Sequence, residues 1–162
     1  MSATSPDPVL PPGLTALSAE EETVMRALGR LLLVLPRAMN ADLEAEQRMT
    51  ASEYNVLRHL SEDPNGRMRM SELAQSCDMS LSGMTRLAAK LESQGYLNRV
   101  KCDEDARGWN AVLTDEGLAR LREAWPTHLA SVRRHIFDHL DGLDLDDLAA
   151  ALNKMATDAD LR

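Results

Sequence analysis

Polar and basic side chains recur between residues 82 and 107 at spacings that suit contact with a nucleic acid. Arginine can bond both acceptors of a guanine, and serine and threonine can bond bases or phosphates. Lysine and arginine also attract phosphates by their charge. The candidates on an expected helix are Ser82, Thr85, Arg86 and Lys90, and those on an expected hairpin are Arg99, Lys101 and Arg107. They can act together only if the chain presents them on one surface.

An amphipathic helix from Ser80 to about Ser93 presents the first four candidates. Ser80 can cap the start of this helix, and Gly95 supplies a stop. The apolar residues fall within about 80° of arc at about 100° per residue, and they are Met84, Leu87, Ala88 and Leu91. The four candidates lie opposite or beside this apolar face. The pattern therefore predicts one buried face and one polar outer face.

The elements around this helix complete a winged helix-turn-helix. A capping box, Thr50-Ala51-Ser52-Glu53, starts a helix that ends at the turn Asp63–Gly66. A short helix follows over about Ser71–Cys77. Two strand-like runs come next, Tyr96–Cys102 and Trp109–Leu113, with a polar tip between them. Because the second helix of such a pair fits the DNA major groove, this order of elements favours a DNA-binding lobe.

Apolar helices flank this lobe on both sides. Residues 19–47 form a long expected helix, and Thr114 caps another whose apolar stripe has heptad-like spacing. The stripe consists of Leu118, Leu121, Trp125, Leu129, Val132, Ile136 and Leu140, and Gly142 ends the helix. Asp144 can cap a last helix with a seam of Leu145, Leu148, Leu152 and Met155. One small lobe cannot cover these faces, so we expect a homodimer.

These elements predict a mainly α fold, α+β with a small β-hairpin wing: a winged helix-turn-helix with N- and C-terminal dimerisation helices. The prolines in residues 1–17 indicate a disordered N-terminal tail. The first dimerisation helix is expected at 18–48, the DNA-binding lobe at 49–114 and the C-terminal dimerisation helices at 115–162.

Several motifs resemble those of the MarR family of bacterial regulators, and the likeness covers about residues 20–156. The helical motifs are Met70-Ser71-Glu72-Leu73-Ala74, Met84-Thr85-Arg86-Leu87 and Leu91-Glu92-Ser93-Gln94-Gly95-Tyr96. The most specific motif is Asp105-Ala106-Arg107-Gly108 followed by Ala111-Val112-Leu113-Thr114-Asp115-Glu116-Gly117. The family pattern there is an Asp-x-Arg wing, followed by Leu-Thr and a Gly where the next helix starts.

The resemblance implies an obligate homodimer that binds a pseudo-palindromic operator on double-stranded DNA, usually as a repressor. It also implies release by a small, often aromatic or phenolic, ligand that binds between the dimer region and the DNA-binding lobe. Carried over, Arg107 is the wing arginine near the minor groove and Asp105 is its positioning partner. Ala106 stands where many members have a second arginine, and Asp103 and Glu104 lower the positive charge of the wing.

Four residues are candidates for the wall of a ligand pocket near the expected kinks at Pro36 and Pro126. Aromatic residues make up only 3% of the chain, so each one near an expected cavity matters. The four candidates are Tyr54, His59, Trp125 and His128. In the alternative interpretation, the tyrosine and the tryptophan are ordinary core residues.

Histidines and cysteines offer two further alternatives. His128, His135 and His139 share one helix face, and the last two have the spacing of a zinc pair, although a polar or interface role also fits. Cys77 is expected to point inward, and Cys102 is expected to be exposed on the wing. A redox switch between the cysteines is the alternative to two unreactive thiols. We expect neither a metal nor a cofactor.

Composition limits the remaining function classes. The net charge is −8, but residues 81–110 hold five Lys and Arg against four Asp and Glu. This acidic balance leaves open a winged-helix dimer that works as a protein-interaction module without binding DNA. The longest apolar run, Leu31–Leu35, is far shorter than the roughly 20 residues of a membrane span. No signal peptide or catalytic motif is evident, so a cytoplasmic, non-enzymatic regulator is expected.

Overall fold

A computed structural model describes residues 11–102 and 108–160, and most of the described residues are helical. The chain divides after Pro36 into two units, and the first helix runs through the division. The elements are α1 (Ala19–Gln47), α2 (Ala51–Glu62), β1 (Arg67–Arg69), α3 (Met70–Ser76), α4 (Leu81–Ser93), β2 (Leu97–Lys101), β3 (Trp109–Leu113), α5 (Asp115–His135), the 3-10 helix η1 (Phe137–His139) and α6 (Leu145–Asp160). This order confirms the expected winged helix-turn-helix within a mainly helical fold.

Local capping explains where three helices of the second unit begin. The Thr50 side chain accepts a hydrogen bond from the backbone N–H of Glu53, and the Glu53 carboxylate accepts one from the Thr50 N–H at 2.8 Å. Ser80 caps α4 and Thr114 caps α5 by accepting hydrogen bonds from backbone N–H groups of the first turn. These starts agree with the sequence prediction because each cap depends only on neighbouring residues.

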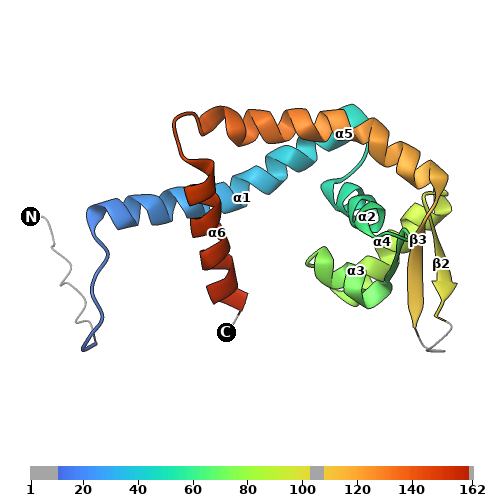
Figure 1. The fold of residues 1–162 in the computed structure, drawn as a ribbon, viewed down its shortest axis with the longest axis horizontal. Helices are drawn as coiled ribbons and strands as arrows, with labels where there is room; N and C mark the ends of the chain where they lie inside the picture. The colour runs from blue at the N-terminus through green and yellow to red at the C-terminus, as the bar shows by residue number, and fades with distance from the viewer. Residues whose placement is uncertain (1–10, 103–107, 161–162) are drawn as a thin grey trace, which may run out of the picture. The chain divides into compact units, whose positions relative to one another are not determined.

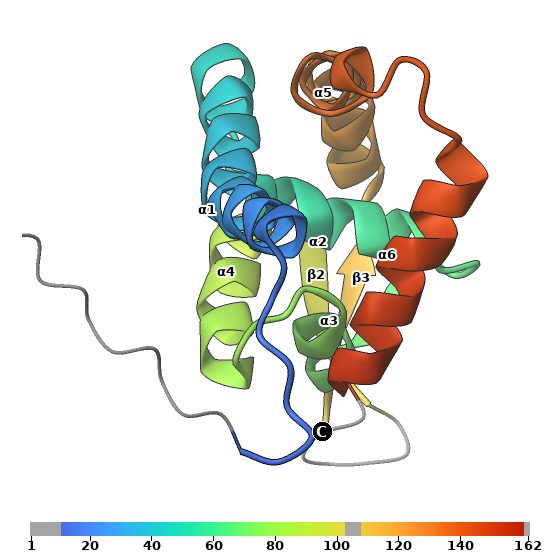
Figure 2. The same ribbon diagram turned by 90° about the vertical axis from the view of Figure 1, so that its left-hand side faces the viewer.

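The helix-turn-helix and the sheet enclose one hydrophobic core. Figures 1 and 2 show α2, α3 and α4 beside the β2–β3 hairpin. The core combines side chains from all of these elements: Tyr54, Val56, Leu57, Leu60, Leu73, Met84, Ala88, Leu91, Leu97 and Ala111. On α4, three of the four expected core residues are fully buried and Leu87 is partly buried. This packing fixes which face of α4 points outward.

The sheet has three strands, whereas the sequence predicted only a two-stranded hairpin. β3 lies in the middle and pairs antiparallel with both β1 and β2. The register places Arg67 opposite Val112 and Leu97 opposite Leu113. β1 was missed because three residues, Arg-Met-Arg, are too short a run to indicate a strand, and the partner that makes it a strand lies far along the chain.

α5 ends earlier than predicted. We expected one helix as far as Gly142, but α5 stops at His135, and the backbone leaves helical geometry at Ile136 (φ −126°, ψ −73°). Phe137–His139 then form a 3-10 turn. A 3-10 turn keeps side chains three residues apart on one side, so the apolar spacing alone could not distinguish it from a continued helix.

Polar contacts join α5 to the last turns of α1. Asp42 accepts hydrogen bonds from Ser131 Oγ at 2.7 Å, and its carboxylate lies 2.9 Å from His135 Nε2. The Ser131 hydrogen bond is the main reason why the pKa of Asp42 lies below its ordinary value. Arg120 donates to the side-chain and backbone oxygens of Gln47. These bonds attach the helix that leaves the wing to the helix that precedes α2.

Large apolar side chains remain exposed on the helices outside the lobe. On α1 they include Leu31, Leu32, Leu33 and Val34, on α5 Trp125 and Leu129, and on α6 Leu145, Leu152 and Met155. Among the described residues, no helix combines the length and the apolar character needed to cross a membrane.

Candidate nucleic-acid interface

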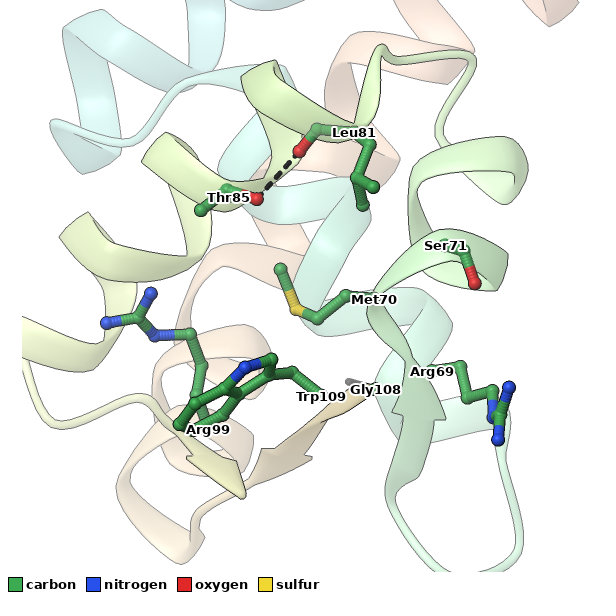
Figure 3. A pocket seen from close by; sticks show the side chains of 8 residues that line it. All are labelled: Arg69, Met70, Ser71, Leu81, Thr85, Arg99, Gly108 and Trp109. Carbon is green, nitrogen blue, oxygen red and sulfur yellow. Dashed lines mark hydrogen bonds between the residues drawn. The ribbon is translucent and has the colours of Figure 1, made fainter. Parts of the chain in front are cut away.

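The outer face of α4 carries three of the expected DNA-reading residues. Ser82, Thr85 and Arg86 are exposed, as the helical pattern predicted. The Thr85 hydroxyl donates to the Leu81 carbonyl at 2.8 Å, so the oxygen of Thr85 is left to act as an acceptor (Figure 3). Ser82 and Arg86 therefore supply the hydrogen-bond donors of this face. An exposed arginine between two hydroxyl side chains is chemically suited to read a guanine edge.

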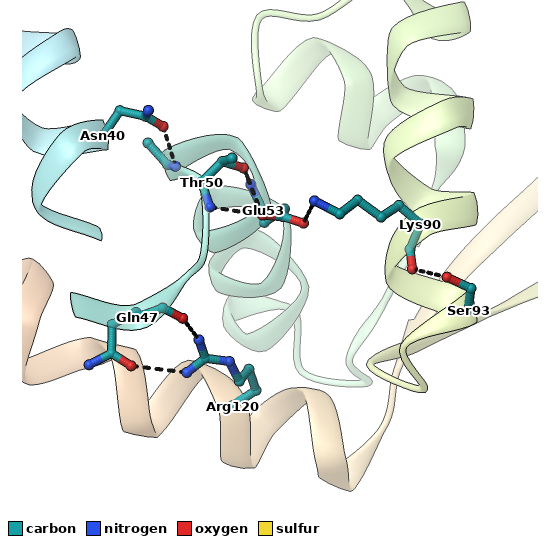
Figure 4. Close-up of polar contacts among 8 residues, drawn as sticks. Asn40, Gln47, Thr50, Glu53, Lys90, Ser93 and Arg120 are labelled. Carbon is teal, nitrogen blue, oxygen red and sulfur yellow. Dashed lines mark hydrogen bonds and ion pairs between the residues drawn. The ribbon is translucent and has the colours of Figure 1, made fainter. Parts of the chain in front are cut away.

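Lys90 lies on the same helix but has a different environment from the one expected. Its Nζ is 2.6 Å from Oε1 of Glu53 on α2, and the Glu53 side chain is only 4% exposed. Burial opposes ionisation of Glu53, but hydrogen bonds from Lys90 and Thr50 outweigh it, so the pKa of Glu53 lies below its ordinary value. Lys90 thus points back toward the protein (Figure 4).

Arg99 is also held within the protein. Glu92, the residue before the end of α4, accepts hydrogen bonds from the Arg99 backbone N–H at 2.9 Å and from Nε at 2.8 Å. Arg99 Nη2 lies 2.6 Å from the same carboxylate. These bonds hold the pKa of Glu92 below its ordinary value. The arginine therefore ties strand β2 to α4. As the second helix of the helix-turn-helix, α4 is called the recognition helix below.

The described part of the wing leaves Lys101 exposed at the end of β2. Its Nζ lies 6.0 Å from the centre of the Trp109 ring on β3, a cation–π distance. Asp105 and Arg107 lie outside the described residues. Cys102 is buried, not exposed as predicted, and its backbone N–H donates to the Gly108 carbonyl at 2.9 Å.

A hollow of about 460 Å³ lies between α3, α4 and the sheet (Figure 3). Met70, Leu81 and Trp109 supply its apolar walls, and Thr85 and Arg99 are among its polar residues. It therefore shares Thr85 with the outer face of α4. Sequence reasoning missed this hollow, since its walls come from α3, α4 and all three strands, which approach one another only after folding.

Three of the four expected ligand-pocket residues lie together. The rings of Tyr54 and His128 stack with centroids 4.4 Å apart, and the Trp125 ring lies 6.0 Å from His128. His59 instead contacts Arg58 and Glu62. The Tyr54 hydroxyl is buried and has no hydrogen-bond partner among the described residues.

Burial sets the protonation state of this cluster. It raises the pKa of the Tyr54 phenol, so the phenol keeps its proton. It also lowers the pKa of His128, and the positive charge of Arg58 acts in the same direction. A neutral phenol and a neutral imidazole thus face each other, which suits hydrogen bonding to an uncharged polar group.

The remaining histidines and cysteines do not converge on a metal. His128 stacks on Tyr54, whereas His135 bonds to Asp42. Over residues 11–102 and 108–157, no group of three or more His, Cys, Asp or Glu side chains has a geometry that could hold a metal ion. Burial raises the pKa of the Cys77 thiol, so this cysteine is a weak nucleophile.

Two ion-paired carboxylates were missed by the sequence prediction. Glu53 was identified only as a capping residue, although it also binds Lys90. Glu92 was quoted only as part of a motif, although it binds Arg99. The sequence shows that both positions carry a carboxylate. It does not show which lysine or arginine pairs with each carboxylate, because that depends on how α2, α4 and β2 pack.

Known proteins resemble this chain in both sequence and fold. Residues 49–108 match the model of the MarR family. The crystal structure of AbsC, a MarR family transcriptional regulator from Streptomyces coelicolor, is 34% identical with a TM-score of 0.82, and the match covers 92% of this chain and 100% of that chain. Sco3205, a MarR family regulator from the same organism solved in complex with DNA, is 32% identical with a TM-score of 0.81, over 90% of this chain and 91% of that chain. The transcriptional repressor MprA of Escherichia coli strain K12 is 31% identical over 80 residues, which are 49% of this chain and 46% of that protein.

Proposed function

The chain belongs to the MarR family, and on that premise we propose that it is a sequence-specific DNA-binding transcriptional regulator that acts as a repressor. The observation that carries this proposal is the exposed face of α4, with Ser82, Thr85 and Arg86 beside a β-hairpin wing. The likeness to Sco3205, a relative crystallised with DNA, supports it. Because its target is DNA, we place its action in the cytoplasm of a bacterium.

In the proposed complex α4 enters the major groove and the wing meets the adjacent backbone. Arg86 bonds to a base edge, Ser82 donates to a base or a phosphate, and the Thr85 oxygen accepts a hydrogen bond from a base amino group. Lys101 binds a phosphate. Arg107 reaches the minor groove, positioned by Asp105, and reads groove width more than base identity.

A homodimer supplies two such lobes. The exposed apolar side chains of α1, α5 and α6 support this part of the proposal, because large apolar patches on a regulator of this size mark an interface. A two-fold axis relates the lobes in a dimer, so the operator is an inverted repeat. Sedimentation at micromolar concentration should therefore give a dimer, and a folded monomer would contradict this part.

An aromatic or phenolic effector is proposed to release the DNA, and the cluster of Tyr54, Trp125 and His128 is its proposed site. The unpartnered Tyr54 hydroxyl and the neutral His128 ring could bond the polar group of such a ligand. The hollow beside α4 is the second candidate, because a ligand there would lie against Thr85 on the DNA-reading face.

The two tryptophans of the chain distinguish these candidate sites. Trp125 belongs to the cluster and Trp109 lines the hollow. Fluorescence titration with phenol as the uncharged phenolic probe, on Trp109→Phe and Trp125→Phe, should show quenching that survives in the first variant and disappears in the second. The reverse pattern moves the site to the hollow, and no quenching in either variant removes this effector class.

A salt series tests DNA binding itself. The affinity for a duplex that carries the flanking region of its own gene should fall steeply as salt rises, because cations that bind phosphates release counterions. A winged-helix protein that only binds other proteins would show no affinity for the duplex at any salt concentration. That result would refute the proposed function.

A further inference from the structure

We propose that Lys90 and Arg99 are positioning residues of the recognition helix and do not bind DNA phosphates. Two ion pairs, Lys90–Glu53 and Arg99–Glu92, hold α4 between α2 and the wing strand β2. This inference rests on the proposed DNA-binding function. It specifies which lysine and arginine side chains of α4 and the wing contact the DNA.

The first pair attaches the second half of α4 to the start of α2. The Lys90 side chain is half-exposed, but its partner carboxylate is buried and also accepts hydrogen bonds from the backbone and the hydroxyl of Thr50. If Lys90 turned outward to a phosphate, it would leave that buried carboxylate without its cation. Removing one partner of such a pair is strongly unfavourable, so Lys90 stays on Glu53.

The same attachment continues from α2 to α1. Asn40 Oδ1 accepts a hydrogen bond from the backbone N–H of Ala51 at 2.9 Å, in the first turn of α2 (Figure 4). Thr50 and Glu53 complete this turn through their reciprocal cap. A continuous set of polar contacts therefore runs from α1 through Glu53 to Lys90 on the recognition helix.

The second pair fixes the wing to the other side of α4. Three nitrogen atoms of Arg99 bind the two oxygens of Glu92, and one of them is the backbone N–H of β2. Nε and Nη2 of the guanidinium both bind Oε2, while the backbone N–H binds Oε1, so the side chain and the backbone of Arg99 together hold both oxygens of the carboxylate. The angle between the recognition helix and the wing strand is therefore set before DNA arrives.

The two halves of α4 therefore have different roles. The second half, with Lys90 and Glu92, holds the helix in place, and the first half, with Ser82 and Arg86, remains available to the bases. A helix that is already held loses less conformational freedom on binding. Lys90 then contributes to affinity without releasing a counterion.

The dependence of affinity on salt separates this role from a phosphate contact. The measurement is the dissociation constant of Lys90→Met for a duplex selected by the wild-type protein from a random library, over a series of salt concentrations. Lys101→Met is the matched control, since it removes the same charge from an exposed position of the wing. We expect Lys90→Met to weaken binding about twofold to tenfold at every salt concentration, with an unchanged slope. We expect Lys101→Met to make the slope shallower by about one unit.

Two further measurements complete the test. Lys90→Arg keeps a cation opposite Glu53 and should restore most of the affinity, and thermal unfolding should show that Lys90→Met is folded at the assay temperature. A slope that falls by about one unit in Lys90→Met would overturn the inference, because Lys90 would then bind a phosphate. Unchanged affinity in Lys90→Met would overturn it as well. Failure of the proposed function would appear earlier, as a wild-type protein that selects no duplex.

Discussion

Replacing Gly117 with alanine should destabilise the junction between the wing and α5. Gly117 is the third residue of α5, is buried, and donates its backbone N–H to the capping hydroxyl of Thr114 at 3.0 Å. A Cβ atom at this position would collide with the carbonyl oxygen of Tyr96 and lie 2.9 Å from Cδ1 of Leu113. That carbonyl already accepts the Thr114 N–H at 3.2 Å, so it cannot move away without weakening this bond.

The sign of the effect follows from two opposing contributions. Helix propensity alone favours alanine over glycine by about 1 kcal/mol. Overpacking against a fixed backbone costs about 1–3 kcal/mol and occasionally more. Because backbone atoms are what a new Cβ meets here, we expect the upper part of this range and a net loss of about 2 kcal/mol. For a chain of this size, that loss lowers the melting temperature by about 4–8 °C.

Thermal unfolding at one fixed protein concentration measures this change, since dimer stability depends on concentration. Ala119→Gly, at an exposed position of the same helix, is the control. It should cost about 1 kcal/mol through helix propensity and leave DNA binding intact. Gly117→Ala should also weaken DNA binding, because it shifts the wing relative to α5. An unchanged or raised melting temperature in Gly117→Ala would refute the close packing of α5 on Tyr96.

Two other substitutions test the DNA-reading face and the aromatic cluster. Arg86→Ala should weaken binding to the selected duplex by about 1–3 kcal/mol and leave the melting temperature unchanged, and unchanged affinity would remove Arg86 from base reading. Burial holds the pKa of His128 below its ordinary value of 6.5, so the unfolded chain takes up the proton first as the pH falls through 6.5. The free energy of unfolding of the wild-type protein should therefore decrease from pH 7 to pH 5 more than that of His128→Gln. Denaturant unfolding at both pH values measures the two decreases, and equal decreases would contradict the lowered pKa of His128.

Local chemistry explains how much of the fold the sequence could predict. The caps at Thr50, Ser80 and Thr114 act within one helical turn, so the starts of α2, α4 and α5 were predictable. The face of α4 that carries Ser82 and Arg86 was predictable for a similar reason, because helical periodicity alone assigns the buried side.

Features that depend on distant partners were not predictable in the same way. β1 is a strand only because β3 pairs with it, and the burial of Cys102 depends on side chains that approach it only in the folded lobe. The partners of Lys90 and Arg99 were equally hidden, since an exposed position on a helical wheel does not show where a long side chain turns. The sequence thus predicted the exposed face of α4 that is proposed to read DNA, but not the contacts that hold this helix.

Selection of duplexes from a random library by the purified protein tests the central claim most directly. Sequence-specific reading by two copies of α4 predicts that the enriched duplexes share an inverted repeat whose half-sites are centred about one helical turn, 10–10.5 base pairs, apart or a multiple of it. A single changed base pair in one half-site should then cost about 1–3 kcal/mol of binding free energy. If no sequence is enriched, or if every duplex binds with the same affinity, the protein is not a sequence-specific DNA-binding regulator and the account is wrong.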